Sequence, residues 1–143
     1  MTTFDSTARH QAREAALQML YQWEVGRVSV HEAVATYWPA RDEAISEDAQ
    51  VFADGLVRGT VERVKEADEL IASHARNWRV ERMAVIDRLV LRMAVYELTR
   101  EPPTPAKVVI NEAIELARTF SGEEAVPFVN GVLDAVRKTL GRE

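Results

Sequence analysis

Apolar residues recur along most of the chain at the three- and four-residue spacing of an amphipathic helix. In the first such segment five apolar side chains fall on one stripe: Ala12, Ala16, Met19, Leu20 and Trp23. Gly26 then stands where a helix commonly ends. We find no segment that alternates apolar and polar residues over the length of a half-buried strand. The chain is therefore predicted to be all-α.

Polar residues mark where several of these helices begin. Ser29 is followed by Glu32 in the spacing of a capping box, and Pro39 is expected to stop the helix that they open. Ser46 is a candidate N-cap for the next helix, and Asp68 is a candidate for the one after that. The first half of the chain is thus predicted to consist of short, capped helices.

The second half shows the same organisation. One helix is expected over 81–99, and another is expected to begin with Thr104 as its cap and Pro105 as its first residue. Gly122 should end that helix, after an inward-facing Phe120, and the last helix should open near Pro127. The buried stripe expected for the last helix is Val129, Val132, Leu133, Val136 and Leu140.

The net charge and the composition limit the classes of function that this chain can have. The formal net charge of −5 argues against strong non-specific RNA affinity, so any RNA binding should be local, specific or shared with a basic partner. The absence of cysteine excludes a thiolate metal site and fits a reducing cytoplasm. No apolar run reaches the roughly 18–20 residues that a membrane span needs. We expect a cytoplasmic protein that does not enter membranes.

Enzyme signatures are missing from the sequence. It has no nucleophile elbow, no phosphate-binding glycine loop, and no histidine pair at metal-ligand spacing. We therefore expect no catalytic residue, no metal and no cofactor. The G-x-x-x-G pattern from Gly55 to Gly59 is expected to serve close helix packing.

Two local patterns are candidates for nucleic-acid binding. Arg9 and Arg13 share a face near the start of the first helix, where backbone N–H groups are also free for a phosphate. Phe128 stands one step off the stripe of the last helix, beside Asn130, where it could stack on a base. A solvated polar face for the arginines, and a packing role for Phe128, remain alternatives.

A further group of arginines makes the middle of the chain locally basic. We expect these side chains to form intramolecular pairs with acidic helices rather than to bind RNA. The group consists of Arg76, Arg79, Arg82, Arg88 and Arg92.

Four segments of the chain resemble the NusB family of transcription antitermination factors. They are AREAALQMLYQWE at 12–24, VIDRLVLRMAVYEL at 85–98, VVINEAIELARTF at 108–120 and FVNGVLD at 128–134, in the order and spacing of that family. The resemblance implies about seven helices in two packed three-helix groups, and no catalysis. It also implies binding to boxA RNA of ribosomal RNA leader transcripts together with the small-subunit ribosomal protein NusE. Other Nus factors and RNA polymerase would complete the assembly.

The resemblance also carries over contact positions. The RNA contacts of the family fall on six residues: Arg9, Arg13, Tyr21, Lys107, Phe128 and Asn130. This chain departs from the family at His10 and Gln11, which are often arginine in relatives, so fewer phosphate contacts are expected. Asp87 and the helix around it are where we expect the ribosomal-protein interface. The acidic net charge would favour an encounter with a basic partner.

The sequence leaves the organisation and two other functions open. We expect a single domain over 1–143, with helical groups at about 6–78 and about 80–141. One alternative is an RNA-binding accessory domain of a ribosomal RNA methyltransferase. The other is a protein-interaction module or homodimer that has lost RNA affinity, which His10 and Gln11 favour.

Overall fold

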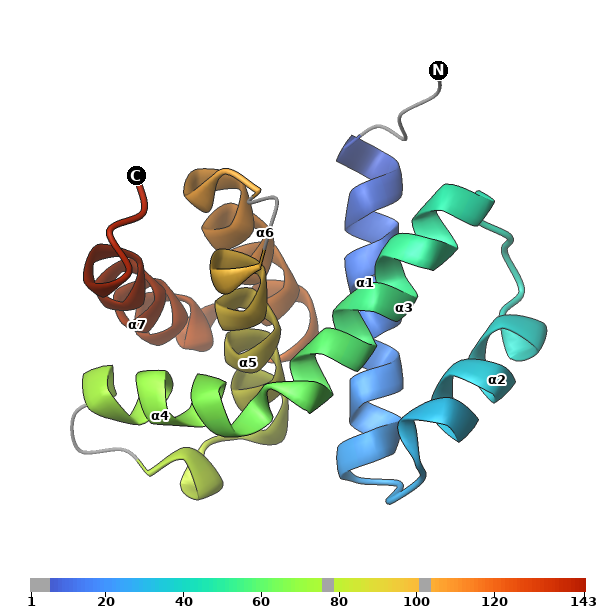
Figure 1. The fold of residues 1–143 in the computed structure, drawn as a ribbon, viewed down its shortest axis with the longest axis horizontal. Coiled ribbons are helices and arrows are strands. Elements are labelled where there is room, and N and C mark those ends of the chain that lie inside the picture. Colours follow the sequence, from blue (N-terminus) through green and yellow to red (C-terminus); the bar gives the residue numbers. More distant parts are fainter. Residues whose placement is uncertain (1–5, 76–78, 101–103) are drawn as a thin grey trace. The chain divides into compact units, whose positions relative to one another are not determined.

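The computed structural model describes residues 6–75, 79–100 and 104–143 of the chain. Within these ranges it contains seven α-helices and two single-turn 3₁₀ helices and no strand, so the predicted all-α class is confirmed (Figure 1). The elements are α1 (Ser6–Glu24), α2 (Val30–Ala40), α3 (Glu47–Glu62), α4 (Val64–His74), η1 (Val80–Arg82), α5 (Val85–Thr99), α6 (Ala106–Phe120), η2 (Glu123–Ala125) and α7 (Val126–Thr139).

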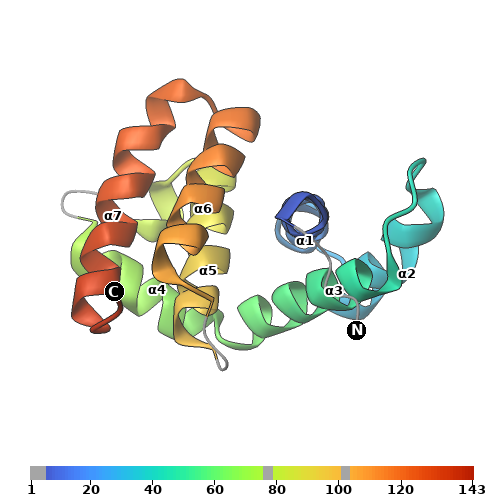
Figure 2. The same cartoon turned by 90° about the horizontal axis from the view of Figure 1, so that it is seen from above.

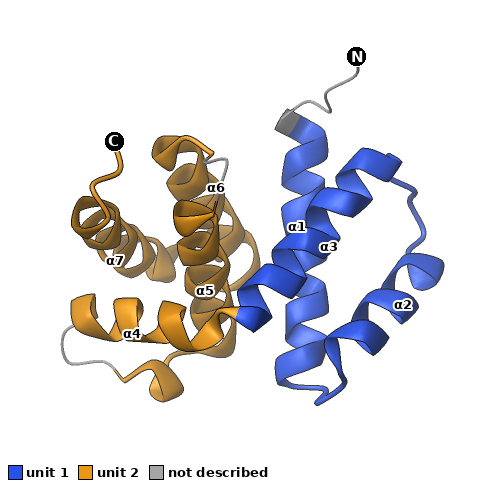
Figure 3. Ribbon diagram, in the orientation of Figure 1, with its two compact units in different colours: residues 1–62 blue, residues 63–143 orange. Residues whose placement is uncertain are grey.

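The helices form two compact units (Figure 3). The first comprises residues 1–62 with α1 to α3, and the second comprises residues 63–143 with α4 to α7. The division falls between Glu62 and Arg63, whereas the sequence placed the change of group near residue 79. The reason is that α4 lies across α5 and α7 and buries Ala67 and Ile71 there, so it belongs with the second group (Figures 1 and 2).

Helix α1 is the centre of the first unit, since it packs against both α2 and α3 (Figure 2). Ala12, Ala15 and Ala16 form part of its buried surface, and such small side chains let the neighbouring helices approach closely. Four residues of the predicted stripe are buried, and Trp23 in the last turn is half-buried. The buried apolar residues of α1 are Ala12, Ala15, Ala16, Leu17, Met19 and Leu20.

Two of the predicted caps are present. The Glu32 backbone N–H donates to Ser29 Oγ at 3.0 Å, and the Ala49 N–H donates to Ser46 Oγ at 3.2 Å. Pro39 lies in the last turn of α2, which ends one residue later. The prediction for Asp68 was wrong, because α4 begins at Val64 and Asp68 stands within the helix, where it pairs with an arginine of α5.

The turn after α1 differs from the predicted glycine cap. The left-handed residue there is Arg27, with φ of 58°, and not Gly26. Gly26 is needed for a different reason, because a Cβ at this position would lie 2.6 Å from the Gln22 backbone oxygen. Close approach of the chain to the end of α1 therefore requires a glycine here.

Helix α5 is the centre of the second unit and packs against α4, α6 and α7. It begins at Val85 rather than at residue 81, because residues 80–82 form the separate turn η1. Arg92 forms an ion pair with Asp68, as expected for the arginine group, and Arg88 donates to the backbone oxygens of Val80 and Met83. Arg76 of that group lies outside the described residues.

The ends of α6 show two departures from expectation and one agreement. Thr104 is buried and is not the cap, because Pro105 takes the N-cap position and the helix starts at Ala106. Phe120, predicted to face inward, is 37% exposed in the last turn. Gly122 closes the helix as predicted, with φ of 143° and its N–H donating to the Ala117 oxygen at 2.9 Å.

Helix α7 follows the predicted stripe closely. Val129, Val132, Leu133 and Val136 are buried, while Leu140, just beyond the helix, is half-buried. The G-x-x-x-G pattern of α3 does not act as predicted at its first glycine. Gly55 is exposed, and a Cβ there would meet nothing within 4 Å.

Candidate nucleic-acid interfaces

The start of α1 holds two arginines against one aromatic ring. The Cζ atoms of Arg9 and Arg13 each lie 5.2 Å from the centre of the Phe52 ring, which α3 supplies. A guanidinium at this distance from an aromatic ring is attracted by its π electrons. Arg9 stays half-buried, but Arg13 is only 2% exposed. Of the two predicted phosphate contacts, only Arg9 is open to solvent in the free chain.

His10, which follows Arg9 at the start of α1, has an acidic neighbour. Its Nε2 lies 3.3 Å from Glu14 Oε2, one helical turn along α1. When the imidazole is protonated, the two side chains form an ion pair. This contact reduces the positive charge that the start of α1 offers to a phosphate.

Tyr21 lies about 12 Å further along α1 than Arg13, as eight helical residues require. It is 39% exposed, and Val25 one turn later is 46% exposed. Tyr21, Val25, Gln18 and Gln22 lie within one stripe of the helix surface, so aromatic, aliphatic and amide groups are exposed together.

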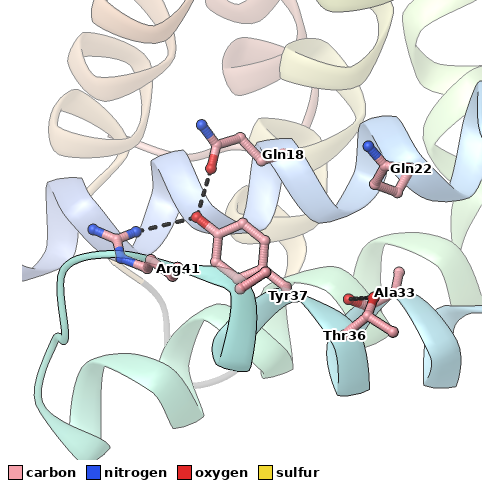
Figure 4. A pocket seen from close by; sticks show the side chains of 7 residues that line it. Gln18, Gln22, Ala33, Thr36, Tyr37 and Arg41 are labelled. Carbon is pink, nitrogen blue, oxygen red and sulfur yellow. Dashed lines mark hydrogen bonds between the residues drawn. The ribbon is translucent and has the colours of Figure 1, made fainter.

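A pocket opens beside this stripe, between α1 and α2 (Figure 4). We call it the α1–α2 pocket; its volume is about 410 Å³. Figure 4 shows Gln18 and Gln22 reaching it from α1, opposite Tyr37 of α2. Its lining consists of Gln18, Gln22, Ala33, Thr36, Tyr37, Ala40 and Arg41.

A chain of hydrogen bonds orders one side of the pocket. Arg41 Nη1 donates to the Tyr37 hydroxyl at 3.1 Å, and that hydroxyl donates to Gln18 Oε1 (Figure 4). The next residue of α2, Trp38, donates from Nε1 to Asp54 of α3 at 2.9 Å. These bonds tie α2 to both neighbouring helices and so hold the pocket wall in place.

The other candidates belong to the second unit. Phe128 is half-buried in the first turn of α7, next to the fully buried Val129, while Asn130 and Gly131 are exposed. No side chain caps the start of α7. The first turn of this helix presents an aromatic ring and an amide close together, which suits a base. Its backbone offers fewer donors to a phosphate, because the Val126 N–H donates to the Glu123 oxygen and Pro127 has no N–H.

Lys107 and Asp87 stand at the starts of two other helices. Lys107 is exposed in the first turn of α6, where the helix dipole disfavours a cation. Lys107 therefore gains no stabilisation from the dipole of α6. Asp87, in the first turn of α5, has its Oδ1 enclosed without a hydrogen-bond partner in the described part of the chain.

The structure thus gives two groups of candidate residues, one in each unit. Arg9 and Arg13 meet around Phe52, a residue that the sequence analysis did not single out. The α1–α2 pocket was likewise not predicted from the sequence. Its one sequence signal was the pair Gln18 and Gln22, which are four residues apart on the polar side of a helix.

Comparison with known proteins identifies the family. Residues 10–138 match the sequence model of the NusB family. The chain belongs to the NusB family. The transcription antitermination protein NusB of Solibacter usitatus is 49% identical over 133 residues, which are 93% of this chain and 90% of that protein. The corresponding protein of Koribacter versatilis is 44% identical over 99% of this chain and 96% of its own length.

Solved NusB structures share the fold. NusB of T. maritima superposes with a TM-score of 0.83 and 34% identity, over 96% of this chain and 93% of that one. A crystal structure of the antitermination factors NusB and NusE with double-stranded RNA contains a chain that superposes with a TM-score of 0.82 and 28% identity. That match covers 94% of this chain and 99% of the other.

Two further findings concern residues 6–75, 79–100 and 104–143. Within them no cluster of three or more histidine, aspartate or glutamate side chains is arranged to hold a metal ion. None of the helices in the same ranges has the length and apolar character to cross a membrane.

Proposed function

We propose that this NusB-family chain is a transcription antitermination factor. It binds boxA RNA of ribosomal RNA leader transcripts together with the ribosomal protein NusE, in the cytoplasm. With other Nus factors it assembles on RNA polymerase, and it catalyses no reaction itself. The observation that carries the proposal is the match over 94% of the chain to a protein solved with NusE and RNA.

In this proposal both units contribute contacts to the RNA. Arg9 neutralises a phosphate, and Tyr21 offers a ring for stacking. The buried Arg13 packs on the Phe52 ring and so helps to position the ring against which Arg9 lies. The second unit contributes Lys107 to a phosphate, Phe128 to a base face and Asn130 to a base edge.

For the partner protein we propose a contact at the start of α5, where Asp87 stands. Asp87 has an enclosed carboxylate oxygen that lacks a hydrogen-bond donor within the described residues. That oxygen is out of reach of a partner, but Asp87 as a whole is only half-buried, so a cationic side chain of NusE would pair with the accessible part of its carboxylate. The net charge of −5 would also speed the encounter with a basic protein.

A second candidate function is a protein-only adaptor or homodimer. The contact between His10 and Glu14 favours it, because it offsets charge where RNA would bind. The methyltransferase alternative gains no such support, since the chain covers 90% and 96% of the two relatives compared above, which are named as antitermination proteins.

The test is RNA binding by Phe128→Ala, measured with labelled boxA RNA with and without NusE at two salt concentrations. We expect affinity to fall by about 1–3 kcal/mol, the size of a lost base stack. The melting temperature should change little, because Phe128 is only half-buried. Phe120→Ala is the matched control, since it removes an exposed phenylalanine from the same unit.

Three results would count against the proposal. Equal RNA affinities for Phe128→Ala and Phe120→Ala would show that Phe128 does not contact the RNA. A large loss of stability in Phe128→Ala would give it a packing role. If the wild-type chain failed to bind RNA even with NusE present, the adaptor function would replace antitermination through RNA.

A further inference from the structure

We propose that the α1–α2 pocket receives one nucleobase of the bound RNA, and that the Gln18 amide nitrogen donates a hydrogen bond to it. The inference rests on the RNA binding proposed above. It adds a base-recognition site to the candidate contacts, formed by Gln18, Gln22 and Arg41, with Tyr21 next to it on α1.

The size and chemistry of the pocket suit a base. Its volume of about 410 Å³ lies in the lower part of the range for small-ligand pockets. Its polar lining is neutral except for Arg41, and no carboxylate lines it. Neutral amides and hydroxyls match the donors and acceptors on base edges, and a site without anions does not repel the phosphates that accompany a base.

The hydrogen-bond chain determines which way the Gln18 amide faces. Arg41 can only donate, so the Tyr37 oxygen accepts from it and the single hydroxyl proton goes to Gln18 Oε1. The Gln18 oxygen is therefore engaged, and its NH₂ group remains as the donor. A carbonyl or ring nitrogen of a base is the acceptor that this group fits.

Gln22 and Tyr21 extend the same face. The exposed Gln22 side chain makes no hydrogen bond to another residue in the parts of the chain that the structure describes, so both ends of its amide are available. Tyr21 lies next to it on α1 with 39% of its surface exposed. An exposed aromatic beside free amides provides a stacking surface next to the donors that read an edge.

Arg41 adds a fixed cation to the pocket. Its Nε donates to the Glu43 backbone oxygen at 2.6 Å and its Nη1 donates to Tyr37, so two neutral oxygens hold it in place. No carboxylate within the described ranges forms an ion pair with it. Its Nη2 group is left for the phosphate that follows the base.

The first experiment compares RNA affinities of single variants of the full chain in the presence of NusE. Gln18→Ala, Gln22→Ala and Arg41→Gln should each weaken boxA binding about threefold to tenfold, as expected for one lost hydrogen bond. Arg58→Gln is the matched control, because Arg58 is exposed on α3 and does not line the pocket. The melting temperature of Gln22→Ala should stay near that of the wild type, since this side chain is exposed. Tyr37→Phe is the stability reference for Gln18→Ala and Arg41→Gln, because it removes the same hydroxyl hydrogen bonds.

The second experiment tests whether a base, and not only a phosphate, occupies the pocket. A series of boxA RNAs carries one abasic nucleotide at each position in turn. When the abasic nucleotide replaces the base that binds in the pocket, Gln18→Ala should not lower the RNA affinity further, because that contact is already lost. With an abasic nucleotide at any other position, Gln18→Ala should lower the affinity as much as it does with unmodified RNA. Tyr37→Phe should behave like Gln18→Ala, since it frees the amide to turn.

The outcomes separate this inference from the proposed function. If Phe128→Ala weakens RNA binding while Gln18→Ala, Gln22→Ala and Arg41→Gln match Arg58→Gln, the pocket inference alone is wrong. It is also wrong if Gln18→Ala acts equally on every abasic RNA, or if the variants weaken NusE binding instead. If the wild type does not bind boxA RNA at all, both proposals fail.

Discussion

Arg92 of α5 and Asp68 of α4 form a two-point ion pair. Arg92 Nε lies 2.8 Å from Asp68 Oδ1, and Nη2 lies 2.9 Å from Oδ2. Arg92 is only 8% exposed, whereas the Asp68 side chain is 31% exposed. The pair thus fixes the contact of α4 with α5 by means of a largely buried guanidinium.

Asp68→Ala should lower the free energy of unfolding by about 1–3 kcal/mol, because it leaves a buried arginine without this carboxylate. Urea denaturation monitored by circular dichroism measures the effect. Asp134→Ala is the control, since Asp134 pairs with Arg137 and Lys138 on the surface of α7. Similar losses in the two variants would show that burial of Arg92 does not matter.

Two exposed helical glycines allow stability and RNA binding to be separated. A Cβ at Gly55 or at Gly131 would meet nothing within 4 Å. Gly55→Ala and Gly131→Ala should therefore each raise the free energy of unfolding by about 0.5–1 kcal/mol, the usual cost of a helical glycine. Only Gly131→Ala should weaken boxA binding, because its methyl group would lie beside Asn130. Unchanged binding by both variants would mean that RNA does not approach α7 closely there.

The turn after α1 should respond in opposite directions at two adjacent positions. Gly26→Ala should destabilise the chain by about 1–3 kcal/mol, because its methyl group would overlap the Gln22 backbone oxygen, 2.6 Å away. Arg27→Gly should stabilise it by up to about 1 kcal/mol, since glycine accepts the positive φ of 58° without strain. Thermal melting of the two variants decides, and a shift in the same direction for both would contradict this description of the turn.

Asp134 provides a prediction about pH. Its hydrogen bonds with Arg137, and next with Lys138, lower the pKa of this carboxyl below its ordinary value of 3.8. A depressed pKa in the folded state contributes stability above pH 3.8, and this contribution is lost as the pH falls through the lower, folded value. Carboxyl NMR titration should show that pKa rising more in Arg137→Gln than in Lys138→Gln. The reverse order would make Lys138 the main partner.

Short-range features of the fold could be predicted from the sequence. The caps at Ser29 and Ser46 depend on a hydroxyl and a backbone N–H three residues later, and both are present. The stripe of α7 and the closing Gly122 are also local patterns. Such features involve one turn of chain, so the residue types alone specify them.

Long-range features could not be predicted in the same way. Asp68 and Arg92 are 24 residues apart, and only the packing of α4 on α5 brings them together. Because of the same packing, α4 belongs to the second unit, so the first unit ends at Glu62 and not near residue 79. Arg13 met the sequence criteria for a phosphate contact, but its burial depends on tertiary neighbours such as Phe52, which no spacing along α1 could reveal. The candidate RNA residues themselves remain predictions until binding is measured.

The Phe52 ring has a consequence for the energetics of RNA capture. A free arginine on a helix surface samples many rotamers, and a phosphate that binds it must stop that motion. Here Arg9 rests against an aromatic face that α3 brings into place when the first unit folds. Much of the loss of side-chain freedom therefore occurs during folding, before any transcript arrives, so even a start of α1 with few cations can hold a phosphate with a small entropic penalty.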